Sequence, residues 1–150
     1  AVFFLVVSAA RGGAVLFGEK DGRLVSVGLP SGDWTVAQIW LRHNTPLDAH
    51  ILADPDHAWR YGSSVRIGAE RDLFHEDVKD AALAMYDRDV ALRVVERRAL
   101  TIDFPARSAG DLSRLARERG LDYLISDERL DLPIVYENAT FRIYALSPEP

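Results

Sequence analysis

The sequence predicts a small α/β domain, in which a Rossmann-like mixed sheet carries flanking helices and a C-terminal antiparallel hairpin. Three observations predict it. Helical patterns and short apolar runs follow one another along the chain, which is typical of helices packed on a sheet. The last two strand-like runs alternate apolar and polar residues around a turn, as an antiparallel edge hairpin does. The chain has 150 residues, 48% hydrophobic and 27% charged, which suits one globular domain.

The first helix is predicted over residues 34–43, where apolar residues recur at helical spacing. Ser and Asp side chains in the preceding loop, residues 29–33, have oxygens that can accept hydrogen bonds from the free amides at the helix start. An Asn-Thr-Pro run at residues 44–46 ends the helix, because the residue before a proline disfavours the α conformation.

Two short strands are expected next. Residues 49–53 form an apolar run closed by Asp-Pro, and residues 64–67 form a second strand-like run. A polar loop that contains His57, Trp59 and Tyr61 is expected between them.

The following segment is predicted to be mainly helical. A helical pattern over residues 77–98 meets an Asp-Arg-Asp cluster at residues 87–89, which predicts either one bent helix or two helices. Ser108 and Gly120 are typical of the start and the end of the next helix.

A strand and a hairpin are predicted for the end of the chain. The strand covers residues 122–126, and residues 132–137 and 140–146 form the two arms of the hairpin, with Asn138 at the turn.

We divide the chain into a lead-in segment, residues 1–33, and a single α/β domain, residues 34–150. Residues 1–7 are apolar but too few to span a bilayer, which takes about 20 residues. They fit either a buried strand, since Val and Phe favour strands, or the last turns of a transmembrane helix that begins upstream.

The composition and motifs argue against several classes of function. A net charge of -5 and a pI near 5.3 disfavour nucleic-acid binding by bulk electrostatics. The chain has no cysteine, and so no thiol nucleophile or thiolate metal site. It shows neither a Gly-rich phosphate loop nor a Gly-x-Ser-x-Gly elbow, and its four histidines lack metal-ligand spacing. We therefore predict no catalytic residue, no metal site and no cofactor.

Two aspartates at the ends of predicted strands are candidate ligand-binding residues. Asp127 follows residues 122–126, and in open α/β sheets the ligand sites lie at the carboxyl ends of the strands. Asp54 follows residues 49–53 and, with Asp56, His50 and His57, could surround a cation there. Asp54 also belongs to an Asp-Pro-Asp sequence that is typical of a turn.

Asp127 also supports an alternative, a metal-dependent nuclease. A strand-end acid resembles those of PIN-type nucleases, and Asp111 would be its partner in such an enzyme. A PIN-type nuclease also needs an acid at the end of its first strand, and residues 6–9 supply none. The carboxylate cluster is therefore incomplete on this reading.

Three further residues are candidate ligand contacts. Trp59 lies in the predicted polar loop, where an aromatic side chain can form a contact surface. Arg71 and Lys79 flank the start of the helix at residue 77 and can bind an anion there. The competing interpretation of these two cations, which we prefer, is that they form solvated ion pairs.

Several short motifs occur in a recognisable order: a Trp-containing helix, Asn-Thr-Pro and a strand ending near proline, an arginine segment, a Lys-Asp pair, an Asp-Tyr-hydrophobic strand and a hairpin. They stand at Trp40, residues 44–55, Arg71, Lys79 with Asp80, residues 122–125 and residues 132–146. This order resembles the soluble C-terminal domain of many polytopic bacterial membrane proteins related to the glycosyltransferases that use lipid-linked sugars.

The resemblance covers residues 34–146, and it implies a domain on the extracytoplasmic side of a bacterial membrane. Its implied partners are the transmembrane part of the same polypeptide and a glycan or lipid-linked sugar. It favours the transmembrane interpretation of residues 1–7. In that family the catalytic acids lie in loops between membrane helices, so the resemblance implies no catalytic residue here. We expect a non-catalytic accessory domain that positions a glycan or polymer acceptor; the alternatives are the nuclease and a small-ligand regulatory domain.

Overall fold

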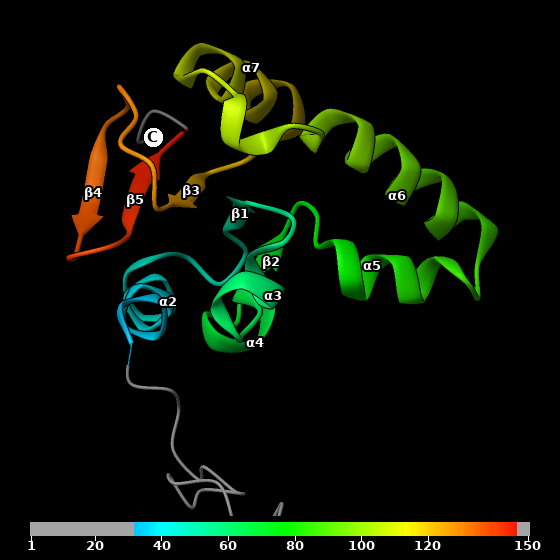
Figure 1. Cartoon of the computed structure of the whole chain (residues 1–150), viewed down its shortest axis with the longest axis horizontal. Coiled ribbons are helices and arrows are strands. Elements are labelled where there is room, and N and C mark those ends of the chain that lie inside the picture. The colour runs from blue at the N-terminus through cyan, green and yellow to red at the C-terminus, as the bar shows by residue number, and fades with distance from the viewer. Residues whose placement is uncertain (1–31, 147–150) are drawn as a thin grey trace, which may run out of the picture. The chain divides into compact units, whose positions relative to one another are not determined.

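The computed structural model describes residues 32–146 (Figure 1). Its helices are α2 (Asp33–Asn44), α3 (His57–Tyr61), α4 (Val65–Gly68), α5 (Asp77–Ala84), α6 (Arg88–Thr101), the 3₁₀ helix η1 (Phe104–Ala106) and α7 (Ala109–Arg119). Its strands are β1 (His50–Ala53), β2 (Asp72–Leu73), β3 (Tyr123–Ser126), β4 (Ile134–Glu137) and β5 (Arg142–Ala145). The predicted strand or membrane helix at residues 1–7 lies outside the described residues, as does most of the lead-in segment. Between residues 32 and 146 no helix has both the length and the apolar character needed to cross a membrane.

The five strands form one mixed sheet in the order β2-β1-β3-β5-β4. Strand β1 pairs in parallel with β2 on one side and with β3 on the other. Strand β5 pairs antiparallel with both β3 and β4. The predicted fold class is therefore confirmed: a small α/β fold whose C-terminal strands are antiparallel.

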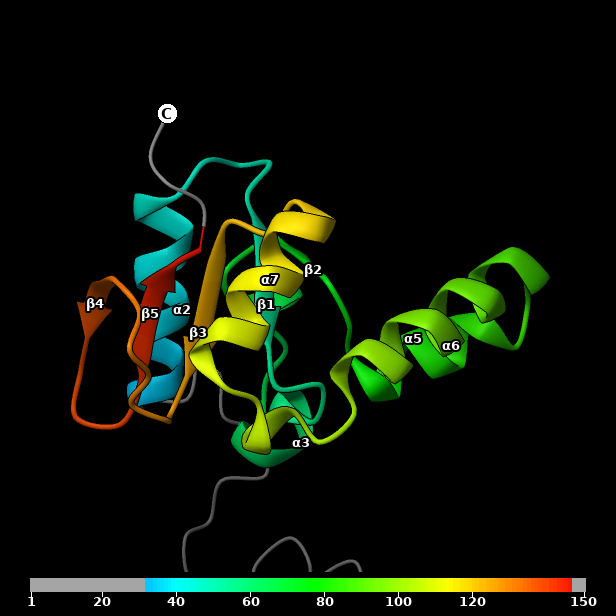
Figure 2. The same ribbon diagram turned by 90° about the horizontal axis from the view of Figure 1, so that it is seen from above.

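The strands β1, β3 and β5 are buried on both faces of the sheet, whereas the edge strand β4 is largely exposed. Ile51, Ile125 and Ile143 belong to the core that includes α2 and α4. Their neighbours Leu52, Leu124 and Tyr144 belong to the core that includes η1 and α7. Successive side chains of a strand point to opposite faces, so β1, β3 and β5 each contribute to both cores. Figure 2 shows α2 and α7 on opposite sides of these strands.

Helix α2 agrees with the predicted helix over residues 34–43, but the predicted cap was wrong. Gly32 occupies the N-cap position and makes no side-chain cap hydrogen bond. The carboxylate of Asp33 instead accepts a hydrogen bond from Thr140 Oγ1 at 2.6 Å. The Asp33 carbonyl accepts one from Asn138 Nδ2 at 2.8 Å. The start of α2 is therefore tied to the turn of the C-terminal hairpin, a contact between distant parts of the sequence.

The loop predicted around His57 and the strand predicted over residues 64–67 are both helical, so these two predictions were wrong. The second segment forms the single turn α4, because Ser64 Oγ accepts the Arg66 amide at 3.2 Å as an N-cap. Helix α4 packs closely against α2: a Cβ on Gly68 would lie 1.8 Å from Gln38 Oε1. Any larger residue at this position would force the end of the Gln38 side chain to move.

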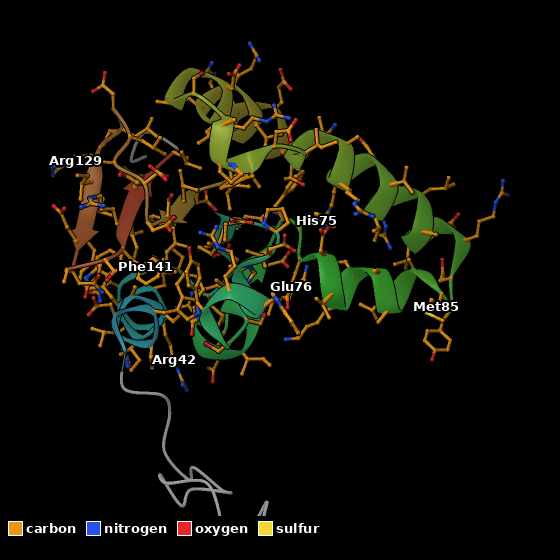
Figure 3. All side chains as sticks on the ribbon, viewed as in Figure 1. Arg42, His75, Glu76, Met85, Arg129 and Phe141 are labelled. Carbon is orange, nitrogen blue, oxygen red and sulfur yellow. The ribbon has the colours of Figure 1, made fainter. Side chains whose placement is uncertain are left out.

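Of the two alternatives predicted for residues 77–98, one bent helix or two helices, the structure has two, α5 and α6. The Asp87 side chain caps α6 by accepting the amides of Asp89 and Val90, at 2.8 and 3.0 Å. The two helices form an arm that extends away from the sheet (Figures 1 and 2). Met85, in the turn at its tip, is 81% exposed and points outward (Figure 3).

Both ends of α7 are as predicted. Ser108 Oγ accepts the Asp111 amide at 3.2 Å, which caps the first turn. Gly120 ends the helix at φ 64°, a left-handed conformation that glycine adopts without the steric penalty of a side chain.

Candidate functional site

The topology brings Asp54 and Asp127 to one edge of the sheet. The chain leaves β1 to form β2 on one side, then returns through α5, α6 and α7 to form β3 on the other side. The boundary between β1 and β3 is therefore a topological switch point, the usual ligand-binding place of such sheets. Asp54 directly follows β1 and Asp127 directly follows β3. The two predicted residues thus lie at the carboxyl ends of neighbouring parallel strands.

Arg60 links the two carboxylates. Its Nη1 donates to Asp54 Oδ2 at 2.5 Å, and its Nη2 lies 3.4 Å from Asp127 Oδ2. Tyr61 Oη donates to the same Asp127 oxygen at 2.8 Å. Arg60 and Tyr61 are adjacent in the short helix α3, and they reach both aspartates because α3 begins just after β1.

The protonation states of these groups follow from their contacts. The hydrogen bond to Asp54 raises the pKa of Arg60, so this guanidinium stays charged. Burial raises the pKa of Tyr61, and the hydrogen bond to Asp127 raises it further. Tyr61 is therefore a neutral donor at physiological pH. The result is a fixed array of two carboxylates, one cation and one phenol.

His57, the first residue of α3, is fully buried. Its Nδ1 lies 2.7 Å from the Asp54 carbonyl, and its Nε2 accepts the Val65 amide at 3.2 Å. These contacts require the neutral tautomer with hydrogen on Nδ1. Burial also lowers the pKa of His57. Both ring nitrogens are occupied, so His57 holds α3 and α4 together.

A cleft of about 80 Å³ lies beside these groups. Its lining includes the apolar residues Phe104, Leu112 and Phe141 and the polar residues Arg107 and Ser126. A wider, more open cleft of about 540 Å³ adjoins it and shares four lining residues with it, Asp54, Arg60, Phe104 and Pro105. An apolar hollow with a few convergent polar groups is the usual form of a small-ligand site.

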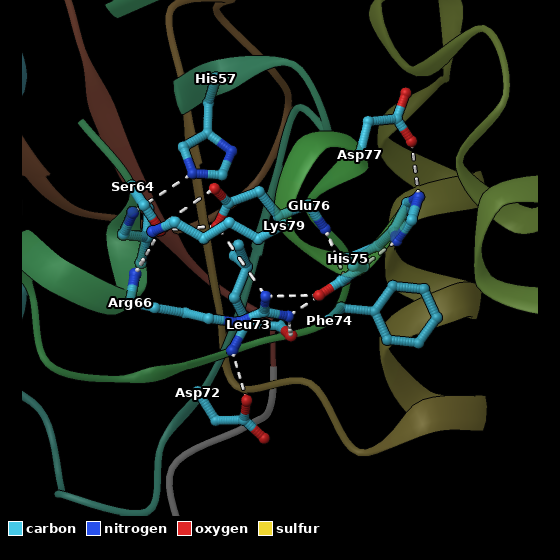
Figure 4. Close-up of polar contacts among 12 residues, drawn as sticks. His57, Ser64, Arg66, Asp72, Leu73, Phe74, His75, Glu76, Asp77 and Lys79 are labelled. Atoms are coloured by element: carbon cyan, nitrogen blue, oxygen red, sulfur yellow. Dashed lines mark hydrogen bonds and ion pairs between the residues drawn. The ribbon is translucent and has the colours of Figure 1, made fainter. Parts of the chain in front are cut away.

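A network of mostly buried polar side chains fixes the start of α5 (Figure 4). Ser64 Oγ donates to Glu76 Oε2 at 2.6 Å. The Asp80 carboxylate accepts hydrogen bonds from Arg66 at 2.5 Å and from the Glu76 amide at 2.9 Å, and lies 3.2 Å from His75 Nδ1. Burial by itself would raise the pKa of Asp80, but these hydrogen bonds outweigh it and hold the pKa well below its usual value.

Lys79 and Trp59 do not line either cleft. The Lys79 ammonium lies 3.7 Å from Glu76 Oε1, at the edge of the buried network. Trp59 is on α3 and is 84% exposed. These two candidates are therefore separate from the pair formed by Asp54 and Asp127.

Arg71 is 7% exposed and its contacts are internal. Its guanidinium donates to the carbonyls of Arg42 and Thr45 at the end of α2, at 2.6 and 2.7 Å. It also donates to Thr45 Oγ1 and the Glu70 carbonyl, each at 3.0 Å. Arg71 thus satisfies helix-end carbonyls that would otherwise be buried without donors.

Asp111, the acid expected to act with Asp127 in a nuclease, forms hydrogen bonds with residues close to it in the sequence. Asp111 accepts from Ser108 Oγ at 2.7 Å and from Arg114 at 2.6 Å. Within residues 32–146 no group of three or more His, Cys, Asp or Glu side chains is placed to hold a metal ion.

Sequence reasoning missed Arg60, Tyr61 and Arg107 as site residues. Arg60 and Tyr61 were assigned to a loop, where their direction is undefined. Helical spacing over residues 57–61 was the available signal, although five residues are too few to establish a period. Arg107 carries no local signal at all.

The fold and the cleft together define a small α/β domain with a small cleft at its topological switch point. A scan against models of known protein families finds no match to the sequence, and a search of curated proteins finds none either.

Proposed function

We propose that this domain is a non-catalytic, extracytoplasmic part of a multispanning bacterial membrane protein related to the glycosyltransferases that use lipid-linked sugars. In this role it packs against the membrane part of the same polypeptide. Its cleft then holds part of a glycan or polymer acceptor. The order of motifs from Trp40 to the C-terminal hairpin supports the membrane context, and the cleft supports the acceptor.

One observation carries the acceptor role: Asp54 and Asp127 are held at the switch point by a shared guanidinium, in a cleft whose lining is partly apolar. Carboxylates accept hydrogen bonds from the hydroxyls of a ligand, and a guanidinium donates hydrogen bonds to the oxygens of those hydroxyls. Because each group is already fixed by its neighbours, little side-chain entropy is lost when a ligand binds.

The protonation states favour binding over proton transfer. A general acid or base works best with a pKa near the operating pH. The raised pKa values of Arg60 and Tyr61 move both groups away from that range, and His57 uses both ring nitrogens internally. These groups suit recognition of a ligand whose chemistry takes place elsewhere.

The acceptor role is tested by titrating the ¹⁵N-labelled 150-residue chain with tetrasaccharides of glucose, mannose and N-acetylglucosamine. We expect at least one of them to shift the amide signals of residues 54–61 and 126–128 in a saturable way. If no tetrasaccharide shifts these signals, the acceptor role is refuted.

The membrane context is tested by cysteine labelling in cells that express the complete gene product. The chain contains no cysteine, so Leu47→Cys, at a position that is 79% exposed, adds one reporter to this domain. We expect a membrane-impermeant maleimide to label it in intact cells beyond the level of the same protein without the substitution. Labelling only after lysis would place the domain on the cytoplasmic side and contradict the proposal.

A further inference from the structure

Three polar side chains of the cleft still have unused hydrogen-bonding groups. Asp127 Oδ2 accepts from Tyr61 and Arg60, whereas its Oδ1 has no partner within residues 32–146. Arg107 donates only from Nε, to the Ile102 carbonyl at 3.4 Å, and its two terminal nitrogens have no partner in that same range. Ser126 Oγ accepts the Glu128 amide at 3.0 Å, and its own proton is directed to no other described residue.

From these groups we infer that the cleft takes the edge of an uncharged sugar ring, with neighbouring hydroxyls bound by Asp127 and Arg107. This inference rests on the proposed function and specifies its ligand. A hydroxyl has one hydrogen to donate and two lone pairs that accept. A ligand with several hydroxyls can therefore donate to the free carboxylate oxygen of Asp127 and accept from the free guanidinium nitrogens of Arg107.

The size of the cleft agrees with a ring edge. The volume of about 80 Å³ is small compared with the roughly 300–1,000 Å³ of sites that enclose a whole ligand, so the cleft admits only part of a sugar ring. The rest of a longer saccharide would then extend into the adjoining cleft of about 540 Å³, which shares Asp54 and Arg60. Phe104 and Phe141 contribute to the apolar part of the lining from the two cores, where they can contact the carbon-bound hydrogens of the ring.

The charges of the lining select against acidic ligands. The lining contains the carboxylates of Asp54, Asp127 and Glu128 and the guanidiniums of Arg60 and Arg107. Arg60 is already paired with two of these carboxylates. A ligand carboxylate or phosphate would therefore meet an excess of negative charge, and like charges across a contact are unfavourable.

The test compares methyl β-glucoside with methyl β-glucuronoside, which has the same ring and one added carboxylate. Both are titrated into the ¹⁵N-labelled 150-residue chain at pH 7, and dissociation constants are fitted to the amide shifts of residues 126–128. We expect the neutral glycoside to bind on the order of tenfold more tightly than the acidic one. Asp127→Asn should weaken the neutral glycoside about tenfold, because it removes a charge-assisted hydrogen bond.

Two further variants serve as the second probe and the control. Arg107→Gln should also weaken the neutral glycoside, and it leaves the folded contacts nearly intact because, among the described residues, the Arg107 side chain donates only the long bond to the Ile102 carbonyl. Asp48→Asn removes an exposed carboxylate that lines neither cleft and should leave the affinity unchanged.

The outcomes separate this inference from the proposed function. Equal or tighter binding of the acidic glycoside at the same amides overturns the inference and leaves an acceptor site in place. Unchanged affinity in both Asp127→Asn and Arg107→Gln overturns it as well, because the hydroxyls must then bind elsewhere. If neither glycoside nor any tetrasaccharide shifts the cleft amides, the inference and the proposed acceptor role fail together.

Discussion

Replacing Arg71 by methionine should destabilise the domain strongly without any ligand present. The guanidinium donates to the carbonyls of Arg42, Thr45 and Glu70 at 2.6, 2.7 and 3.0 Å. Methionine fills much of the same space but leaves these carbonyls without their donor. A buried acceptor deprived of its partner loses about 1–3 kcal/mol. The hydrogen bond to the Thr45 carbonyl is buried and those to Arg42 and Glu70 are partly buried, so the three together give about 3 kcal/mol.

That loss is large compared with the 5–15 kcal/mol of stability that is usual for a domain. For a domain of this size it lowers Tm by about 12 °C, at about 4 °C per kcal/mol. The assay is urea unfolding of the 150-residue chain, followed by the fluorescence of Trp34, which is 5% exposed in the native core. Thermal unfolding followed by circular dichroism gives Tm.

Arg42→Met is the matched control at the same corner of the fold. Arg42 pairs with Glu70 at 2.9 Å, but both side chains are about half exposed. An exposed pair of this kind contributes less than about 1 kcal/mol. If Arg71→Met destabilises the domain no more than Arg42→Met does, the structural role assigned to Arg71 is refuted. Its role as a ligand contact would then deserve a direct binding test.

Two other predictions concern the packing of α4 and the buried network at α5. Gly68→Ala should lower the free energy of unfolding by about 1 kcal/mol, since the new Cβ would lie 1.8 Å from Gln38 Oε1. In a Gln38→Ala background this loss should largely disappear. Additive effects of the two substitutions in this double-mutant cycle would contradict the clash. The folded-state pKa of Asp80 is below its unfolded value of about 4, so its stabilising effect is complete above pH 4 and is lost as the pH falls further. Asp80→Asn should therefore destabilise the domain by about 3 kcal/mol at pH 7 and by much less near pH 2. Urea unfolding at both pH values measures the two losses. An equal loss of stability at the two pH values would exclude an ionic role for the Asp80 carboxylate.

Helix α4 shows why local propensity failed between the first two parallel strands. Val65 and Ile67 favour a strand, and the sequence contains no helical period long enough to oppose them. The helical turn is decided by contacts with other segments. His57 accepts the Val65 amide at 3.2 Å, and Gly68 lets the turn approach Gln38. Neither contact is visible in a window of a few residues.

The site itself was predicted in part. Each aspartate could be assigned to the carboxyl end of its own strand, because a buried strand followed by an acid is a local pattern. That the two strands are neighbours could not be predicted, because it depends on the parallel pairing of β1 with β3 across about 70 residues. Arg60 joins the pair only because residues 57–61 form a helix and direct its side chain back to the sheet edge.

The sequence by itself determined the elements that have long or strongly punctuated patterns. These are helix α2, the break between α5 and α6, helix α7 between Ser108 and Gly120, strand β3 and the terminal hairpin. Each is specified by burial periodicity or by capping residues that act within a few positions of one another. The tertiary structure alone decided the strand order, the helical form of residues 57–68 and the pairing of Asp54 with Asp127 through Arg60. The physical reason is range: periodicity and caps act along the chain, whereas strand pairing and buried hydrogen bonds act between segments that meet only when the chain has folded.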